Sequence, residues 1–291
     1  SAADYLKEQP AYAEVFDGLD DTKLHRGYIE QILTQSEYQD FTRLYRFSSM
    51  KQRKFLDLYF KHYEVEVIKK LLRHMLGGRE GQTDLSMFQG FFEKHSELDL
   101  ETLCRAKNFS EFTEALEGTV YGKLLSQMQE KGQTGLFDCE LKLDLFYFQL
   151  LWKLRNKLLS KTERKILDDC FGSRLDLLNI QWICRARSFY RLSQAEIYAL
   201  LIPVHYRLRA DKVKLLVEAE DDAKFFAVLR ETPYGKQEEL QTGQMPDIQL
   251  LSNQMLNRIY GRTGHRYPHS PAVLDSYLYR KELEMRKIVT A

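Results

Sequence analysis

The sequence predicts an all-α protein made of three similar helical lobes, and three observations support this prediction. A short pattern, in which an apolar residue follows an acid and an isoleucine lies four positions after the acid, begins at Glu64, Asp176 and Glu284. The copies are 112 and 108 residues apart, close to the usual size of a domain. Only six prolines occur among 291 residues, so long stretches can be helical. Neither sustained strand alternation nor a βαβ rhythm is found.

A second pattern repeats with a compatible step. Phe, Leu, Thr, Tyr, Gly and Lys occur at positions 112, 116, 119, 121, 122 and 123, and each recurs 113 residues later. The first third carries a weaker version in Phe16, Leu19, Thr22 and Leu24. We therefore predict lobes at residues 1–78, 79–190 and 191–291. The chain starts without methionine and ends inside the third copy of the acid pattern, so we expect further residues at both ends and a truncated third lobe.

Apolar spacing and chain breakers predict the individual helices. The clearest covers residues 55–76, where apolar side chains recur every three, four or seven positions before Gly77 and Gly78. Ser110 and Ser193 resemble helix starts, the latter with a capping-box Glu196. Further helices are predicted at 98–106, 109–117, 121–131, 143–159, around 177–184, and at 193–201, 210–219, 221–230 and from about 273. Loops are predicted at 77–83, 130–135, 232–246 and 261–271.

The acid and the isoleucine of each repeat share one helix face. Two interpretations are open: the acid is favoured near the N-terminal turn of a packed helix, or the three acids converge on an axis and meet a partner. We prefer the first. It predicts that Ile68, Ile180 and Ile288 face lobe cores.

Composition excludes several classes of protein. With 44% hydrophobic and 29% charged residues, the chain is expected to be globular rather than disordered. A formal charge of +1 argues against a dedicated nucleic-acid binder. Cysteines 104, 139, 170 and 184 lack CxxC spacing and are interpreted as reduced thiols. No apolar run reaches the ~20 residues needed to span a bilayer, and no signal peptide is recognised.

No constellation of catalytic or metal-binding residues stands out, so we predict no catalytic, cofactor or metal site. His265 and His269 have metal-ligand spacing but fall in a predicted loop. The acid runs 168–169 and 220–222 are typical of solvated faces or helix starts. The basic stretches 185–191 and 205–209 interleave arginines with aromatics, and we interpret them as internal or interface contacts rather than nucleic-acid sites. The Tyr-Gly-Lys sequences lack the glycines of a phosphate loop.

The repeated elements resemble those of the C subunit of A-type and bacterial V-type ATP synthases, a family related to the d subunit of the vacuolar ATPase. The L-x-x-T-x-Y element is matched at residues 116–121 and 229–234, and the acid-apolar-x-Asn-Ile core at 176–180. The copies beginning at Glu64 and Glu284 depart from this core, with Val67 and Lys287 in place of asparagine.

The resemblance implies three helical lobes around a pseudo-threefold axis, shaped like a funnel. It also implies a non-catalytic rotor adaptor of a rotary ATPase that links the central stalk to the membrane proteolipid ring and transmits torque for ion or proton transport. Such a protein is cytoplasmic, peripheral on the membrane, and not an enzyme. The resemblance does not predict which residues bind partners, which ion is coupled, or whether ATP is mainly synthesised or hydrolysed. The alternatives are a freestanding α-helical repeat scaffold or peptide-binding protein, and an enzyme with a pocket between lobes.

Overall fold

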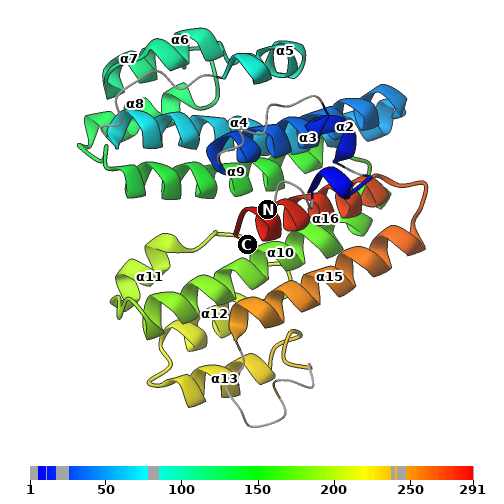
Figure 1. Ribbon diagram of the computed structural model, residues 1–291. Coiled ribbons are helices and arrows are strands. Elements are labelled where there is room, and N and C mark those ends of the chain that lie inside the picture. The colour runs from blue at the N-terminus through cyan, green and yellow to red at the C-terminus, as the bar shows by residue number, and fades with distance from the viewer. Residues whose placement is uncertain are drawn as a thin grey trace.

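The computed structural model describes residues 6–10, 12–17, 26–77, 85–236, 240 and 247–290, and every regular element in these ranges is an α-helix (Figure 1). The predicted all-α class is confirmed. The threefold arrangement of lobes and the divisions after residues 78 and 190 remain predictions.

Six long helices form three consecutive pairs, each joined by a short connection. The pairs are α3 (Arg26–Phe47) with α4 (Met50–Leu76), α9 (Leu136–Leu158) with α10 (Lys161–Ser188), and α15 (Ile248–Arg266) with α16 (Pro271–Thr290). The most extensive packing joins α4 to α9, α15 to α16 and α10 to α15. The acid patterns lie on α4, α10 and α16, the second helix of each pair.

Short helices follow α4 and α10 in the same manner. Helices α5 (Ser86–His95), α6 (Leu100–Arg105), α7 (Phe109–Glu114) and α8 (Gly122–Glu130) lie between α4 and α9 in the chain. Helices α11 (Gln194–Leu200), α12 (Ala210–Val217) and α13 (Asp222–Arg230) lie between α10 and α15. Helices α5, α6 and α7 lie at the top of the molecule and α13 at the bottom, with the long helices between them (Figure 1). The short α2 (Ala13–Phe16) packs on α3.

Serine side chains fix where three helices begin. Ser49, Ser160 and Ser193 each form a capping box, in which the serine oxygen accepts from the N3 amide and the N3 side chain accepts from the serine amide. The predicted start at Ser193 is confirmed. The start predicted at Ser110 was wrong, because α7 is capped by Asn108, whose side-chain oxygen accepts from the amide of Glu111 at 3.0 Å.

The molecule has two large apolar cores, which lie in different parts of the fold. One lies around α4 and α9 and contains Ile68, and the other lies around α10 and α15 and contains Ile180. Both isoleucines are fully buried, whereas Ile288 is half-buried against a smaller cluster that includes Tyr12 and Phe16. The prediction that these isoleucines face cores is confirmed. All four cysteines are free.

The predicted loop at 261–271 was wrong over its first half, because α15 continues to Arg266. Gly261 and Gly264 do not break this helix. They allow close packing instead: a Cβ at Gly264 would lie 3.0 Å from the Cβ of Ser276 on α16. Helices α2, α3, α5 and α15 were not predicted. Residues 18–25, 78–84, 237–239 and 241–246, which include much of two predicted loops and most of the weak first copy of the second pattern, lie outside the described residues.

Candidate functional site

The repeated acids lie far from the helix ends. Glu64 and Asp176 occur near the middle of α4 and α10, and they are only 1% and 0% exposed. The interpretation that these acids favour an N-terminal turn was therefore wrong, since the helix dipole acts within the first turn. A buried carboxylate must instead find hydrogen-bond donors elsewhere in the fold.

Asp176 receives four hydrogen bonds from two segments that are distant in sequence. Its Oδ2 accepts from the amides of Arg207 at 2.7 Å and Leu208 at 2.8 Å, and its Oδ1 accepts from the amide of Tyr206 at 3.1 Å. The hydroxyl of Tyr234 donates to Oδ2 at 2.7 Å. Burial raises the pKa of Asp176, and the hydrogen bonds from Tyr234 and the three amides oppose that rise. This acid joins α10 to the 206–208 loop and to the second repeated motif.

Asn179 holds the start of the same loop. Its side-chain amide donates to the carbonyl of Ile202, and its side-chain oxygen accepts from the amide of Ile202, both at 2.9 Å. The two bonds satisfy the backbone of Ile202 on both sides. Asp176 and Asn179, one turn apart, therefore fix both ends of the segment 202–208 against α10.

Glu64 occupies the equivalent position on α4 but uses side-chain donors. Its Oε2 accepts from the Tyr121 hydroxyl and from Lys61 Nζ, both at 2.8 Å, and its Oε1 accepts from the Ser96 hydroxyl at 2.5 Å. Val67 stands where α10 has Asn179, so no side-chain amide is available on α4 to hold the following loop. The acid–tyrosine bond is the contact that both helices retain.

The L-x-x-T-x-Y element forms the turn that presents this tyrosine. The Thr119 hydroxyl donates to the carbonyl of Leu116 at 2.7 Å and accepts from the amide of Tyr121 at 3.2 Å. Thr232 makes the same pair of bonds with Leu229 and Tyr234, at 2.7 and 3.2 Å. The threonine thus closes a local turn, and the leucine anchors that turn in the core.

The glycine after each tyrosine is required by close backbone approach. A Cβ at Gly122 would lie 2.4 Å from the carbonyl oxygen of Leu116, and one at Gly235 would lie 2.2 Å from that of Arg230. These glycines have a packing function.

The third copy differs from the other two. Glu284 is exposed on α16, and the tyrosine near it is Tyr12, which is not part of the repeated element. Burial, followed by the hydrogen bond and charge of Glu284, raises the pKa of Tyr12 well above its usual value. Lys281 Nζ lies 4.4 Å from the centre of the Tyr12 ring and donates to its hydroxyl at 3.3 Å. These contacts join the N-terminal part of the chain to α16.

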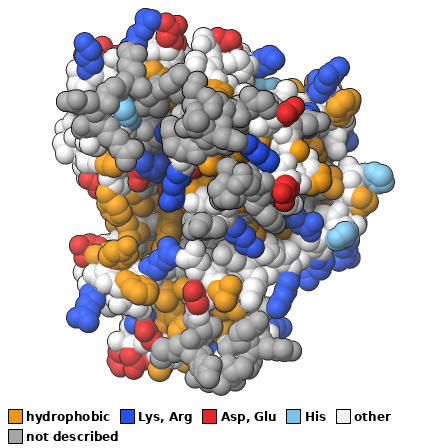
Figure 2. Space-filling model, in the orientation of Figure 1, with side chains coloured by type: hydrophobic (Ala, Val, Ile, Leu, Met, Phe, Trp, Pro, Cys, Tyr) orange, Lys and Arg blue, Asp and Glu red, His pale blue; other side chains and the backbone are white. Residues whose placement is uncertain are grey.

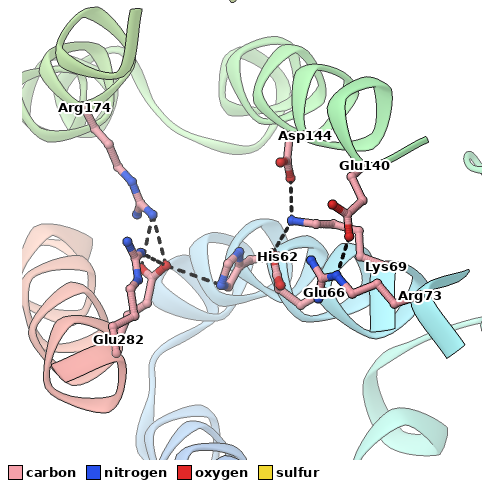
Figure 3. A network of polar contacts seen from close by, with 9 residues as sticks. His62, Glu66, Lys69, Arg73, Glu140, Asp144, Arg174 and Glu282 are labelled. Carbon is pink, nitrogen blue, oxygen red and sulfur yellow. Dashed lines mark hydrogen bonds and ion pairs between the residues drawn. The ribbon is translucent and has the colours of Figure 1, made fainter. Parts of the chain in front are cut away.

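A cluster of polar contacts around Glu282 joins α16 to α4 and α10, and separate ion pairs join α4 to α9 (Figure 3). Arg174 on α10 donates to both carboxylate oxygens of Glu282 at 3.1 and 3.2 Å. His62 on α4 lies 3.5 Å from Glu282, and Arg286 also pairs with it. Burial favours the protonated form of Glu282, but the charge of Arg174, then those of His62 and Arg286, hold its pKa well below the usual range.

Further ion pairs, separate from the Glu282 cluster, lie along α4. Lys69 Nζ lies 2.9 Å from both Glu66 and Asp144, and Arg73 pairs with Glu140 (Figure 3). Asp144 and Glu140 belong to α9, so these pairs brace α4 against its main packing partner. Lys69 is buried, so breaking its ion pairs would leave a desolvated charge without a partner, which is costly.

Two acids next to these contacts, half-buried Glu37 and fully buried Asp275, carry raised pKa values. Burial, followed by the charge on Glu282, raises the pKa of Glu37 to about 7. Burial raises the pKa of Asp275 to about 8, although the charge of Arg174 opposes the rise. Asp275 is 0% exposed, and neither of its carboxylate oxygens has a hydrogen-bond partner among the described residues. Neither acid was singled out from the sequence.

The acid runs and basic stretches that were considered for metals or nucleic acids are used inside the fold. Asp168 pairs with Arg155, Asp169 accepts from the Tyr206 hydroxyl, and Asp221 caps α13. Arg187 donates to backbone carbonyls at 219 and 221. Within the described ranges, no group of three potential metal ligands is present. His265 lies in the last turn of α15 and His269 beyond its end.

Apolar side chains are exposed at the edges of the molecule. A small cluster combines α9, α10 and the 202–204 segment, and its partly buried members are Leu141, Phe148, Trp152, Leu178 and Trp182. Phe189 and Tyr190, at the C-terminal end of α10, are 79% and 72% exposed. Figure 2 shows orange side chains gathered in an indentation of the left edge, between the two halves of the molecule. Large contiguous apolar patches on a surface are typical of interaction sites.

The fold and the repeated contacts define an all-α protein with internal sequence repeats. The model of the ATP synthase (C/AC39) subunit family matches residues 1–291, and the chain belongs to this family. It is similar to the C subunit of the A-type ATP synthase of Methanothermobacter thermautotrophicus, at 25% identity over 98% of the chain and 73% of that relative. The proteins of the same name from Pyrococcus abyssi and Pyrococcus horikoshii are 28% and 30% identical over 65% of the chain.

The chain spans about half the length of the two Pyrococcus relatives, 51% in each case. None of the helices in the described ranges combines the length and apolar character needed to cross a bilayer.

Proposed function

We propose that this protein is a non-catalytic rotor adaptor of a rotary ATPase, which links the central stalk to the membrane proteolipid ring and transmits torque for ion transport. Its relatives are named as C subunits of A-type ATP synthases, and this supports membership of such a complex. The adaptor would be cytoplasmic and peripheral on the membrane, with stalk and ring proteins as partners and no nucleic acid.

The observation that carries the proposal is the cross-bracing of the long helices. A torque-transmitting part needs to resist shear between its elements. The Arg174–Glu282 pair joins α10 to α16, and the Lys69–Asp144 pair joins α4 to α9. Arg174, Glu282 and Lys69 are largely buried, so relative sliding of the helices would leave these charges without partners and away from water. The acid–tyrosine bonds fix the short helices in the same way.

Exposed apolar surface supplies the second requirement, which is contact with partners. Phe189 and Tyr190 present two large aromatic faces at one end of α10. Aromatic side chains supply much of the binding energy at protein interfaces.

Reconstitution tests the proposal. The chain is mixed with the central stalk proteins and the detergent-solubilised proteolipid ring, and complexes are separated by size-exclusion chromatography. We expect a complex that contains all three components, and we expect calorimetry to show no tight ATP binding by the isolated chain. Failure to bind the stalk or the ring would exclude the adaptor function, and micromolar nucleotide binding would point to an enzyme.

A further inference from the structure

The outer face of α15 is strongly basic. Arg258, Arg262, His265 and Arg266 lie at i, i+4, i+7 and i+8, so they share one side of the helix, and all four are exposed. The sequence of α15 contains neither aspartate nor glutamate. Figure 2 shows blue and pale-blue side chains gathered at the lower right, where Figure 1 places α15.

Helix α16 adds a further guanidinium to this face. A Cβ at Gly261 would lie 3.2 Å from Nη2 of Arg280, so the missing side chain leaves room for Arg280 against α15. Gly261 stands three residues after Arg258 and four before His265, on the same side of the helix. Among the described residues, no carboxylate forms an ion pair with Arg262, Arg266 or Arg280.

Helix stability explains only part of this arrangement. His265 and Arg266 lie in the last turn, where cations interact favourably with the helix dipole. Arg262 is a turn earlier and Arg280 belongs to the neighbouring helix, so neither is explained in this way. Elsewhere, surface arginines such as Arg207 and Arg209 have acidic partners within the chain.

We propose that this face, defined by Arg258, Arg262, His265, Arg266 and Arg280, binds an acidic helix of a partner protein. The arginines from 258 to 266 span about 12 Å along α15, in steps of one helical turn. Carboxylates at i and i+4 on a second helix repeat with the same step, and guanidinium groups bind carboxylates through paired hydrogen bonds.

A lipid surface is the less suitable partner for this face. Surface-bound helices combine basic residues with large apolar side chains that enter the bilayer. The exposed large apolar side chains of α15 and α16 are Leu250, near the opposite end of α15, and Tyr277, whose hydroxyl is bonded to Asp40. The inference is independent of the proposed adaptor function, because it requires neither the stalk nor the ring.

Peptide binding tests the proposal. The probe is an alanine-based helical peptide of about 15 residues with glutamates on one face at i, i+4 and i+8, and its scrambled version has the same charge. We expect the patterned peptide to bind the full chain several-fold more tightly than the scrambled one, with affinity that falls as salt is added.

The Arg262→Glu/Arg266→Glu variant should weaken binding about tenfold or more. The matched control is Lys123→Glu/Lys131→Glu, which makes the same charge change at two exposed positions on and just after α8 and should bind like the parent. Circular dichroism and melting curves establish that both variants are folded.

Equal binding of the patterned and scrambled peptides, or equal loss in the control variant, would overturn the proposal. Vesicles of phosphatidylcholine and phosphatidylserine form the second arm. One outcome is that the vesicles bind the parent chain but not the Arg262→Glu/Arg266→Glu variant, with no competition from the patterned peptide. In that case the face binds a membrane and the acidic-helix proposal is wrong.

Discussion

Replacing Asp275 with asparagine should make the protein more stable at neutral pH and less sensitive to pH. The carboxyl is fully buried without a hydrogen-bond partner among the described residues, and its pKa is about 8 in the fold, against 3.8 for an ordinary aspartate. A folded-state pKa above the unfolded value means that the native state holds the proton more tightly. The stabilisation is therefore complete below about pH 4 and is lost as the pH rises towards 8.

The magnitude follows from proton linkage. Between about pH 5 and 7 the native state holds nearly one proton more than the unfolded chain at this site, and each pH unit then costs up to about 1.4 kcal/mol. The parent should thus lose roughly 2–3 kcal/mol over this range through Asp275 alone. Asparagine has nearly the same shape and does not titrate. The advantage of Asp275→Asn over the parent should therefore grow by that amount from pH 5 to pH 7.

Urea unfolding at pH 5, 6 and 7, followed by tryptophan fluorescence, measures this difference. Asp211→Asn is the control, because Asp211 is 59% exposed and lies 3.2 Å from Arg209 on the surface. The unfolding free energy of Asp211→Asn should change with pH in the same way as that of the parent. If the curves for Asp275→Asn and the parent are also parallel, Asp275 does not titrate in this range and the reasoning is refuted.

Three further predictions concern the contacts described above. Tyr234→Phe removes a donor from buried Asp176 and should cost about 1–3 kcal/mol of unfolding free energy. The hydroxyl of Tyr260 is buried without a partner among the described residues, so Tyr260→Phe should be nearly neutral. Equal effects of the two variants in urea unfolding would contradict a stabilising Asp176–Tyr234 bond. Ile180→Ala should cost about 2–5 kcal/mol and half-buried Ile288→Ala less, and an unchanged melting temperature for Ile180→Ala would show that this face is not a core. Because the pKa of Glu282 is lowered in the fold, its ionised form stabilises the protein above about pH 4.5, and this stabilisation is lost on acidification. Glu282→Gln should therefore lose less stability than the parent between pH 5 and pH 3. An identical dependence on acid pH would argue against the pairing with Arg174.

Local patterns predicted many of the helices and the burial of the repeated isoleucines, because apolar spacing depends on residues within a few turns of one another. The helix predicted at 55–76 is present as part of α4, and Ile68 and Ile180 are buried as expected. The role of the acids could not be predicted, because their partners are distant in the chain: Tyr121 lies 57 residues after Glu64, and Tyr234 lies 58 after Asp176.

The errors have equally specific causes. Gly261 and Gly264 indicate a chain break when considered alone, but α16 packs so closely on α15 that a helix is kept there. Helix α3 was missed because its buried side chains are few and include the polar Ser36. Asp275 and Glu282 were missed because nothing in a single sequence marks an isolated acid as buried.

The Glu64–Tyr121 and Asp176–Tyr234 hydrogen bonds explain how the repeated residues can make the fold rigid. A buried carboxylate is tolerated only while its donors are in place, and the tyrosine donors Tyr121 and Tyr234 follow the short helices α7 and α13 in the chain. Opening of the segment that carries either tyrosine would leave Glu64 or Asp176 buried without this donor, so local opening carries a penalty beyond the loss of one hydrogen bond. The same holds for Glu282 if α10 moves away from α16. Each of these contacts converts relative motion of helices into unpaired buried charge, and this penalises separate opening of the short helices or of α10 from α16.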